Sequence, residues 1–310
     1  MNKNLRIVFM GTPDFAVASL DILVQNGFNI VGVITAPDKP AGRGLQLQES
    51  AVKRYAVSKG LTVLQPEKLK NPEFLETLSA LKADLQVVVA FRMLPEVVWN
   101  MPPEGTINVH ASLLPNYRGA APINWAVING EKESGVTTFK LQHEIDTGDV
   151  LFSQTVKISD NETAGELHDA LMQTGAELLL KTVNAIAAGN AKGTPQADIP
   201  AADIKHAPKI FKETCQINWQ QPLDTVYNLI RGLSPYPTAF TTFQGKSMKI
   251  FSGHKEQVTP TVAPGEFLTD EKTYIKIAAS DGYLFLDEIQ LEGKKKMDIV
   301  SFLRGYRFTN

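Results

Sequence analysis

The sequence predicts an α/β fold with an open, mostly parallel sheet in the N-terminal part and a small β-barrel after it. The first observation is a series of apolar runs that alternate with helical segments, which is typical of βαβ units. The second is a group of short strands with hairpin turns after residue 208. The third is the length of 310 residues, which is enough for two domains that each bury a core.

The chain begins with a strand, a tight turn and a helix. Residues 5–10 are apolar and predict a buried strand, and Pro13 suits the first turn of a helix that ends near Gly27. The turn GTPDFA lies where the fingerprint of a dinucleotide-binding protein would lie. It holds only one glycine, so it does not support a close approach of pyrophosphate and disfavours a nicotinamide-dependent enzyme.

The following elements continue the alternation of strand and helix. Helices are expected at residues 50–60 and 72–82, and strands are expected at residues 30–35, 62–64 and 85–91. The run at 85–91, LQVVVAF, is almost entirely apolar, as in a strand at the centre of a parallel sheet.

The stretch GTINVHASLLPNYRG, at residues 105–119, ends a strand with polar side chains. Residues 106–109 alternate like a strand, and Asn108 and His110 are two positions apart, so their side chains point to the same side. Pro115 then interrupts regular structure. Ligands of open α/β sheets bind outside the carboxyl ends of strands. The pair therefore offers an amide and a titratable imidazole to a ligand, or it simply closes the strand end as a satisfied polar pair.

A second stretch, GVTTFKLQHEIDTGDV at residues 135–150, runs from a strand into an acidic turn, and another strand is expected at 151–156. Asp146 stands in this turn before Thr-Gly, where its carboxylate can cap the turn. Beside His110 and Asn108 it can instead hold a proton or orient the imidazole.

The clearest helix is expected at residues 163–188, and a shorter one at 121–129. Thr163 and Glu166 have the spacing of a capping box at the start of the longer helix.

Residues 189–207 are rich in Gly, Ala and Pro and predict a linker between a domain at 1–188 and a second domain at 208–310. The second domain should hold one helix at 223–233 and several short strands, with hairpin turns at Gln244-Gly245 and Asp281-Gly282. These strands are expected at 239–243, 248–252, 266–268, 274–278 and 283–290.

Charge and cysteine content narrow the classes of function. The net charge of −2 argues against an indiscriminate nucleic-acid binder, but residues 205–310 hold 14 Lys/Arg against 11 Asp/Glu, which is compatible with an RNA contact. The single Cys215 excludes an internal disulfide and a cysteine-rich metal site, and it should pack as a small apolar residue. The N-terminal apolar run is too short to span a membrane and lacks a cleavage signal, which predicts a cytoplasmic enzyme.

The motif N-x-H-x-S-L-L-P at residues 108–115, followed by the I-D-T-G-D turn at 145–149, resembles the folate-dependent formyltransferase family. The resemblance covers essentially the whole chain, including the linker and the closing residues 291–305, and it extends to the branch of the family that acts on methionyl-tRNA. It implies a Rossmann-like catalytic domain that binds folate and an OB-like C-terminal domain that binds tRNA.

The resemblance implies a one-carbon transferase of translation initiation, expected to act as a monomer and without a metal. It would transfer the formyl group of its co-substrate 10-formyltetrahydrofolate to the amino group of charged initiator methionyl-tRNA. Asn108 and protonated His110 would donate hydrogen bonds to the tetrahedral oxyanion. Asp146 would favour protonation of His110 and accept the proton that the amine loses.

Two segments are expected to bind the folate. One forms a shaped wall and consists of Ser112, Leu113, Leu114 and Pro115. The other follows the strand at 85–91, faces the pterin through backbone and apolar contacts, and consists of Phe91, Arg92, Met93 and Leu94. Many relatives have Tyr-Gly where Phe91-Arg92 stands, so a role for the Arg92 side chain is left open.

The loop at residues 36–47 is longer than a compact fold needs and is rich in Pro, Gly and basic residues. By itself it fits either a functional loop or a solvated connection. Its sequence PDKPAGRG resembles the insertion by which the tRNA-specific relatives grip the acceptor arm. Arg43 and Lys39 in this loop, and Lys209 at the start of the second domain, are therefore expected to bind tRNA.

Three other functions remain open. A formyltransferase acting on a sugar or nucleotide amine would share the same catalytic residues, although the basic loop and the closing segment disfavour it. A formyltetrahydrofolate hydrolase would release formate without an amine acceptor. A non-catalytic nucleotide-binding module could bind RNA through its barrel and would not bind folate.

Overall fold

The structure is a computed structural model that describes residues 4–41, 46–199 and 203–308. The chain forms two compact units that are not continuous in sequence. The N-terminal unit contains residues up to Gly119 together with Ser134–Val156 and His168–His206. The C-terminal unit contains Ala120–Glu133, Lys157–Leu167 and the residues from Ala207 onward.

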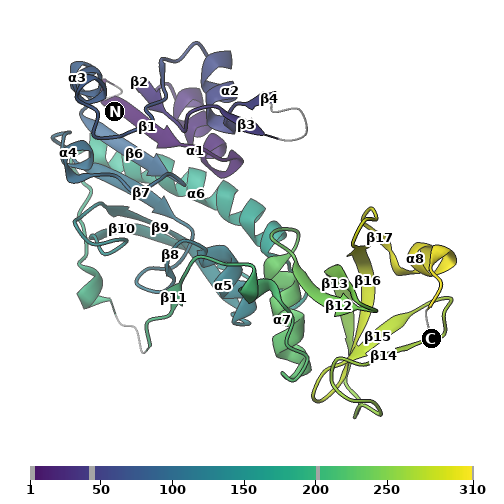
Figure 1. The fold of residues 1–310 in the computed structure, drawn as a ribbon. Helices are drawn as coiled ribbons and strands as arrows, with labels where there is room; N and C mark the ends of the chain where they lie inside the picture. The colour runs from purple at the N-terminus through teal and green to yellow at the C-terminus, as the bar shows by residue number, and fades with distance from the viewer. Residues whose placement is uncertain (1–3, 42–45, 200–202, 309–310) are drawn as a thin grey trace. The chain divides into compact units, whose positions relative to one another are not determined.

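The N-terminal unit is built on a seven-stranded sheet in the order β10-β9-β7-β6-β1-β2-β5 (Figure 1). Neighbouring strands from β5 to β7 pair in parallel, and β9 pairs antiparallel to β7. The expected mostly parallel sheet is therefore confirmed. Its strands are β1 (Arg6–Gly11), β2 (Asn29–Ile34), β5 (Val63–Leu64), β6 (Leu85–Val89), β7 (Thr106–His110), β9 (Glu133–Lys140) and β10 (Val150–Lys157).

Helices cover both faces of this sheet. Helices α3 (Pro72–Ala80) and α4 (Glu96–Trp99) pack through Phe74, Leu78 and Val98 against Val8, Met10 and Val88. On the other face, Gly175 of α6 (Ala164–Ala187) lets the helix approach Val109 and Val136 closely. Helix α1 (Asp14–Gln25) meets α6 through the rings of Phe15 and His168, whose centroids are 5.2 Å apart, and α2 (Ala51–Ser58) packs beside α1.

The expected capping box begins the longest helix. The backbone N–H of Thr163 donates to Glu166 Oε2 at 2.8 Å, and the N–H of Glu166 donates to Thr163 Oγ1 at 3.2 Å. Gly189, at φ +70°, ends the helix in the left-handed conformation that glycine adopts most readily.

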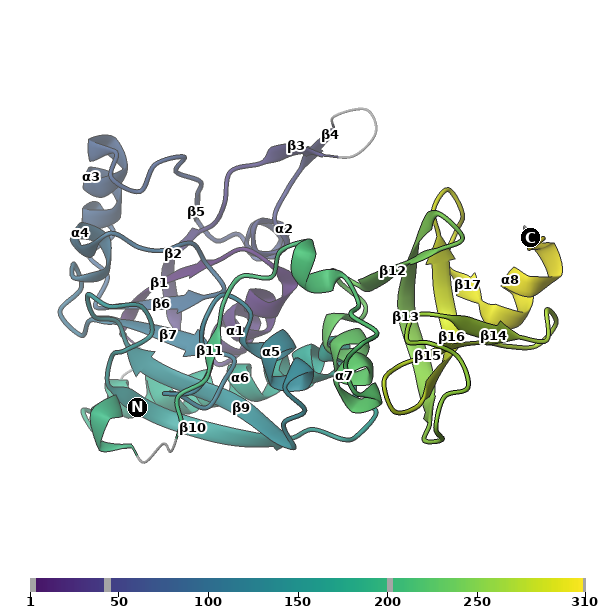
Figure 2. The same cartoon turned by 60° about the horizontal axis from the view of Figure 1, so that its bottom comes forward.

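The segment at 36–47, expected to be a loop, contains a β-hairpin instead. Strands β3 (Lys39–Ala41) and β4 (Gln46–Gln48) pair antiparallel, set apart from the main sheet (Figure 2). These two strands were not predicted, because proline and glycine residues interrupt the local pattern that would indicate a strand. At the root of the hairpin, the Asp38 carboxylate binds the Lys53 ammonium and accepts a hydrogen bond from Gln65 Nε2 at 2.7 Å. Lys39 is exposed, and Arg43 lies outside the described residues.

The C-terminal unit is built on a curled antiparallel sheet in the order β12-β13-β16-β15-β14, with β17 beside β16. This confirms the expected barrel-like domain. Gln244 and Gly245 both have positive φ, +44° and +76°, as a tight hairpin turn requires. The strands are β12 (Ala239–Phe243), β13 (Lys246–Glu256), β14 (Phe267–Thr269), β15 (Ile275–Ala278), β16 (Tyr283–Leu291) and β17 (Met297–Asp298).

Three helices pack within this unit: α5 (Pro122–Ile128), α7 (Leu223–Leu233) and α8 (Ile299–Gly305). Asn124 Nδ2 of α5 donates to the Gly232 carbonyl of α7 at 2.8 Å. A Cβ at Gly232 would lie 2.5 Å from the Ile128 side chain, so the two helices touch closely. Cys215 packs in the core of this unit, and burial raises the pKa of its thiol.

Within the described ranges, every helix falls short of the length and apolar character that crossing a bilayer requires.

Candidate active site

The predicted site lies where β6 and β7 leave the N-terminal sheet. Val89 pairs with Val109 in parallel register, so the loop after β6 and His110 emerge at the same edge. Asn108 and His110 lie two apart on β7, and the antiparallel strand β9 places Phe139 and Thr137 opposite them.

His110 is buried and has a defined partner for one ring nitrogen. Its Nε2 lies 2.9 Å from the carbonyl oxygen of Tyr117. Because a carbonyl only accepts, Nε2 carries the hydrogen of this bond. The other nitrogen, Nδ1, faces Asp146 Oδ2 at 3.9 Å. Nδ1 is therefore the atom through which this imidazole can take up or release a proton.

Asp146 is held in a strained turn beside the imidazole. Its φ of +56° is left-handed, a conformation that Asp tolerates better than most residues. Its Oδ2 accepts a hydrogen bond from the backbone N–H of Gly119 at 3.0 Å. The separation of 3.9 Å from His110 Nδ1 is too long for a hydrogen bond, so the pair is close but not joined.

Gly148 fixes this turn against the end of β9. A Cβ at this position would lie 1.6 Å from the carbonyl oxygen of Lys140, so only glycine fits there. The acidic turn therefore approaches the backbone at the end of β9 closely at this residue.

Asn108 is half-buried, and its side-chain amide makes no hydrogen bond to any residue in the described parts of the chain. A polar group in such a position is free to bind a ligand. The structure therefore brings His110 and Asp146 together in the N-terminal unit, with Asn108 two positions before His110 on the same strand.

The segment Ser112 to Pro115 is held rigidly beside these residues. Ser112 Oγ donates to the Asn116 carbonyl at 2.6 Å, and the Leu114 N–H donates to Thr137 Oγ1 at 3.1 Å. The same Thr137 hydroxyl donates to the Ser112 carbonyl at 2.7 Å. Leu114 and Pro115 are buried and Leu113 is half-buried, so the segment can act as a fixed surface.

The loop after β6 contains both buried and exposed side chains. Phe91 is half-buried, Met93 is exposed, and Leu94 packs into the apolar cluster beneath. The Arg92 guanidinium donates to the Glu67 carbonyl at 2.7 Å and also to the Pro66 carbonyl. This side chain therefore holds a neighbouring backbone segment.

The two predicted tRNA-binding residues that the structure describes lie in different units. Lys39 lies on the β3–β4 hairpin of the N-terminal unit, whereas Lys209 lies in the C-terminal unit with its ammonium 5.6 Å from the centre of the Phe211 ring. Among the residues that the structure describes, no three His, Cys, Asp or Glu side chains are grouped as metal ligands would be.

Sequence reasoning missed Gln196, which lies in the expected linker. Its side chain is 5% exposed and reaches the Asp146 turn, where Nε2 donates to the carbonyls of Asp146 and Gly148, both at 2.8 Å. Its Oε1 accepts hydrogen bonds from Arg118. A single glutamine in a stretch without periodicity gives no sequence signal for such a role.

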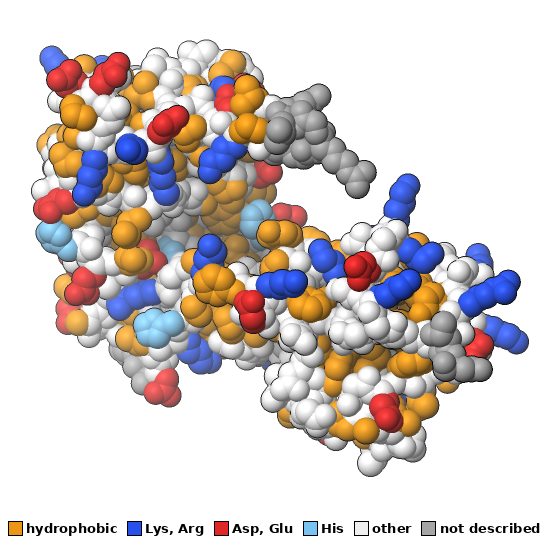
Figure 3. Space-filling view, in the orientation of Figure 1, with side chains coloured by type: hydrophobic (Ala, Val, Ile, Leu, Met, Phe, Trp, Pro, Cys, Tyr) orange, Lys and Arg blue, Asp and Glu red, His pale blue; other side chains and the backbone are white. Residues whose placement is uncertain are grey.

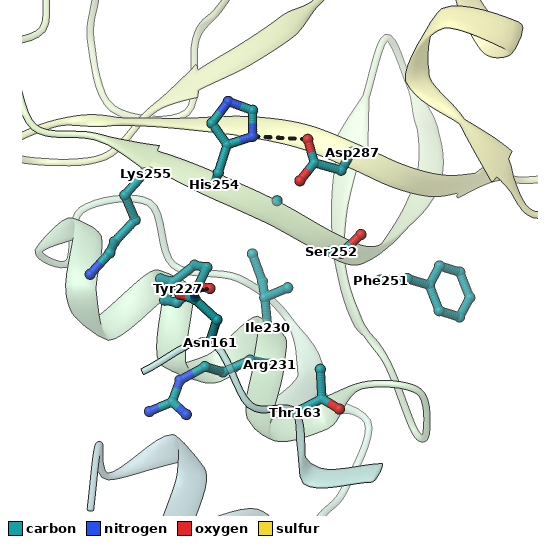
Figure 4. Close-up of a pocket in the computed structure, with 11 residues that line it drawn as sticks. Asn161, Thr163, Tyr227, Ile230, Arg231, Phe251, Ser252, His254, Lys255 and Asp287 are labelled. Atoms are coloured by element: carbon teal, nitrogen blue, oxygen red, sulfur yellow. Dashed lines mark hydrogen bonds and ion pairs between the residues drawn. The ribbon is translucent and has the colours of Figure 1, made fainter. Parts of the chain in front are cut away.

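A separate hollow of about 330 Å³ lies within the C-terminal unit, between α7 and β13 (Figure 4). Its charged groups already have partners. His254 Nδ1 lies 2.9 Å from Asp287, Lys255 binds Asp224 at 2.5 Å, and the guanidinium of buried Arg231 donates to the Glu162 carbonyl at 3.0 Å. Because these charged groups already have partners, they are less available to a ligand than Asn108 and His110 at the end of β7.

Two family models match the chain: Formyl transferase over residues 5–183 and Formyl transferase, C-terminal domain, over residues 209–307. The methionyl-tRNA formyltransferase of Parabacteroides distasonis is 56% identical over 313 residues, covering 98% of this chain and 97% of the relative.

Solved structures share the fold at lower identity. An N-formyltransferase from Helicobacter canadensis, in complex with folinic acid and dTDP-3-aminofucose, has a TM-score of 0.68 at 22% identity and covers 94% of this chain and 99% of its own. HypX from Aquifex aeolicus, in complex with tetrahydrofolic acid, has a TM-score of 0.64 at 21% identity and covers 96% of this chain. This chain spans 46% of that HypX chain. By its two domain matches and its full-length relatives, the chain belongs to the formyl transferase family.

Proposed function

We propose that this protein transfers the formyl group of 10-formyltetrahydrofolate to the amino group of charged initiator methionyl-tRNA. The observation that carries the proposal is the near full-length identity of 56% to a methionyl-tRNA formyltransferase. The arrangement of Asn108, His110 and Asp146 supports it, because these side chains supply the donors and the base that the reaction needs.

The reaction begins when the neutral amine of the methionyl group attacks the formyl carbon. The developing oxyanion needs preorganised donors, and the Asn108 amide, which has no hydrogen-bond partner among the residues that the structure describes, is one of them. The second is His110, whose Nε2–H is engaged by Tyr117 and whose Nδ1 becomes a donor on protonation. The 3.9 Å gap between Nδ1 and Asp146 Oδ2 leaves that donor available to the substrate rather than to the carboxylate.

Asp146 serves the same transition state by its charge and as a base. Its Oδ2 lies 3.9 Å from His110 Nδ1, so its negative charge faces the imidazole and supports His110 electrostatically. It also accepts the proton that the attacking amine loses, directly or through one water. Collapse of the intermediate then restores the carbonyl and breaks its bond to N10 of the folate, and N10 receives the proton that Asp146 took from the amine, directly or through one water.

The folate site is proposed at the same sheet edge. The wall of Ser112, Leu113, Leu114 and Pro115 is fixed by buried hydrogen bonds and can hold a planar ligand in place. Phe91 and Met93 add apolar surface from the loop after β6, with Leu94 packed beneath them. We assign Arg92 to holding that loop, because its guanidinium already binds two carbonyls.

The tRNA is proposed to bind through Lys39 of the hairpin, through Arg43 and through Lys209, with residues 208–310 as the tRNA-binding domain and 189–207 as its connection to residues 1–188. Lys and Arg side chains are prominent on the face of the C-terminal unit seen in Figure 3. Because the three proposed catalytic residues come from one chain and charged tRNA is cytoplasmic, we propose a monomer that acts in the cytoplasm.

A formylation assay tests the proposal. Purified protein, charged initiator methionyl-tRNA and 10-formyltetrahydrofolate should yield formyl-methionyl-tRNA. A reaction without tRNA that releases formate at the same rate would indicate a hydrolase, and formylation of a nucleotide-linked amino sugar in place of the tRNA would indicate a sugar-specific enzyme.

A further inference from the structure

The segment from Gly193 to Ile199 packs directly on the acidic turn. Thr194 and Val150 exchange two backbone hydrogen bonds, both at 2.8 Å. A Cβ at Gly193 would lie 2.7 Å from the Cβ of Asp149, and Ile199 packs against the apolar cluster beneath the turn. This part of the interdomain stretch therefore belongs to the catalytic edge of the N-terminal unit.

Gln196 is the buried polar contact of this segment. Its Nε2 uses both hydrogens, one to the Asp146 carbonyl and one to the Gly148 carbonyl, each at 2.8 Å. Its Oε1 accepts two hydrogen bonds from one guanidinium, at 3.0 Å from Arg118 Nε and 2.6 Å from Arg118 Nη2. The amide is thus fully satisfied, and its orientation is fixed by the arginine.

The Asp146 turn needs such a contact. A non-glycine residue at φ +56° persists only where its surroundings determine the conformation. Besides Gln196, the turn is held by the Asp146 carboxylate, which accepts from the Gly119 N–H at 3.0 Å, and the remaining side-chain contacts are weaker. Thr147 Oγ1 donates to the Glu144 carbonyl at 3.1 Å, and His143 pairs with Glu96 at 3.4 Å on the surface, where such pairs contribute little.

The arginine links the turn to the other half of the site. Arg118 stands between Tyr117, whose carbonyl accepts from His110, and Gly119, whose N–H donates to Asp146. One hydrogen-bonded pair, Arg118–Gln196, therefore connects the backbone that holds the imidazole with the backbone that carries the carboxylate.

We infer that Gln196, oriented by Arg118, is a positioning residue of the formyl transfer. Its amide fixes the turn and so sets the separation between Asp146 Oδ2 and His110 Nδ1. The inference rests on the proposed function, in which Asp146 is the base. It gives Gln196, a residue of the interdomain stretch, an effect on turnover that depends on Asp146.

The test uses full-length protein and compares turnover in two backgrounds. Gln196→Met keeps the volume but removes both amide bonds, and we expect kcat to fall about 10- to 100-fold because a displacement of about 1 Å costs that much. The KM values for folate and tRNA should stay within about twofold, since the turn acts on the reacting atoms. In an Asp146→Asn background, Gln196→Met should change kcat by less than about twofold, because the base that it positions is gone.

Two further variants distinguish a positioning role of Gln196 from a role in packing alone. Gln86→Met removes another buried amide from the same sheet, one that accepts from Thr106 at 3.0 Å, and should leave kcat unchanged. Gln196→Glu keeps an acceptor for Arg118 but offers no hydrogen to the two carbonyls, so kcat should fall at least as far as in Gln196→Met. If Gln196→Met does not fold, Arg118→Met in both backgrounds gives the same comparison from the other side of the contact.

The outcomes distinguish this inference from the proposed function. An inactive wild type, or an Asp146→Asn variant with normal turnover, would overturn the proposed function. With those two results as expected, an equal loss of kcat from Gln196→Met in both backgrounds would make the residue merely structural. An undiminished kcat in folded Gln196→Met would overturn the inference as well.

Discussion

Two of the His–Asp pairs in the described residues, His110–Asp146 and His254–Asp287, differ in burial and in the separation of their polar atoms. In the N-terminal unit, the side chains of His110 and Asp146 are 8% and 11% exposed and stand 3.9 Å apart. In the C-terminal unit, those of His254 and Asp287 are 64% and 45% exposed and touch at 2.9 Å (Figure 4). The His254 ring also stacks on Phe285, with centroids 4.9 Å apart.

The difference shows that contact alone does not mark a reactive pair. His254 and Asp287 satisfy each other in water, and such a pair contributes at most about 1 kcal/mol. His110 Nε2 and Asp146 Oδ2 are each bound to a backbone group, and the 3.9 Å between His110 Nδ1 and Asp146 Oδ2 leaves the two side chains close but not hydrogen-bonded to each other. Buried polar groups are normally paired, so a site that leaves them open is prepared for a third group.

The strongest test of the difference between the two pairs is to remove the charge of Asp146. Asp146→Asn keeps the shape, tolerates the left-handed backbone and still accepts from Gly119. Turnover should fall by at least about 100-fold, because the base and the electrostatic support of His110 are lost together. Single-turnover formylation measures the effect, with circular dichroism as the control for folding. Normal turnover in the folded variant would exclude Asp146 from the mechanism.

The second change removes the neutral donor beside the pair. Asn108→Ala should lower kcat about 100-fold, which corresponds to about 3 kcal/mol for one preorganised oxyanion donor. Folate affinity should change little, because the donor acts on the transition state. Combined with His110→Ala, the losses should be less than multiplicative, since both side chains serve one oxyanion. Fully multiplicative losses would mean that the two residues act in separate steps.

The third change acts on the substrate and leaves the buried pair intact. Arg43→Ala should raise the KM for charged tRNA and flatten the salt dependence of tRNA binding by about one unit of log–log slope, while folate binds as before. Lys70→Ala, at an exposed position of the same unit, serves as the matched control. Parallel salt series of equal affinity for Arg43→Ala and the wild type would assign Arg43 to the solvent.

The smallest effect should come from the exposed pair. His254→Asn should change turnover by less than about twofold and the free energy of unfolding by at most about 1 kcal/mol. Urea unfolding and the formylation assay measure the two quantities. A loss of turnover comparable to that of Asp146→Asn would place essential chemistry in the C-terminal unit and remove the distinction between the pairs.

Local patterns predicted most of the fold. The capping box of Thr163 and Glu166 and the hairpin turn at Gln244-Gly245 each depend on residues within three positions of each other, and both predictions are confirmed. The β3–β4 hairpin was missed because neither of its three-residue strands has a period to detect.

In the candidate site, too, the features that depend on local patterns were predicted and the others were not. The strand-end rule singled out Asn108 and His110, and the turn sequence singled out Asp146, but their roles remain predictions. The separation of His110 Nδ1 from Asp146 Oδ2 could not be predicted from a local pattern. The same holds for the hydrogen bonds of Gln196, which join it to Asp146 and Arg118, 50 and 78 positions away in the sequence.

The two units are interleaved in sequence, and this determines the effect of cleaving the chain within residues 189–207. Helix α5 precedes residues 189–207 and α7 follows them, yet both helices belong to one core and are joined through Asn124, Ile128 and Gly232. A protease that cut this stretch would sever covalent continuity without separating the halves, which would co-purify as a non-covalent complex. Either half expressed alone would expose apolar surface that its counterpart normally covers, so the two should complement each other as fragments rather than behave as independent domains.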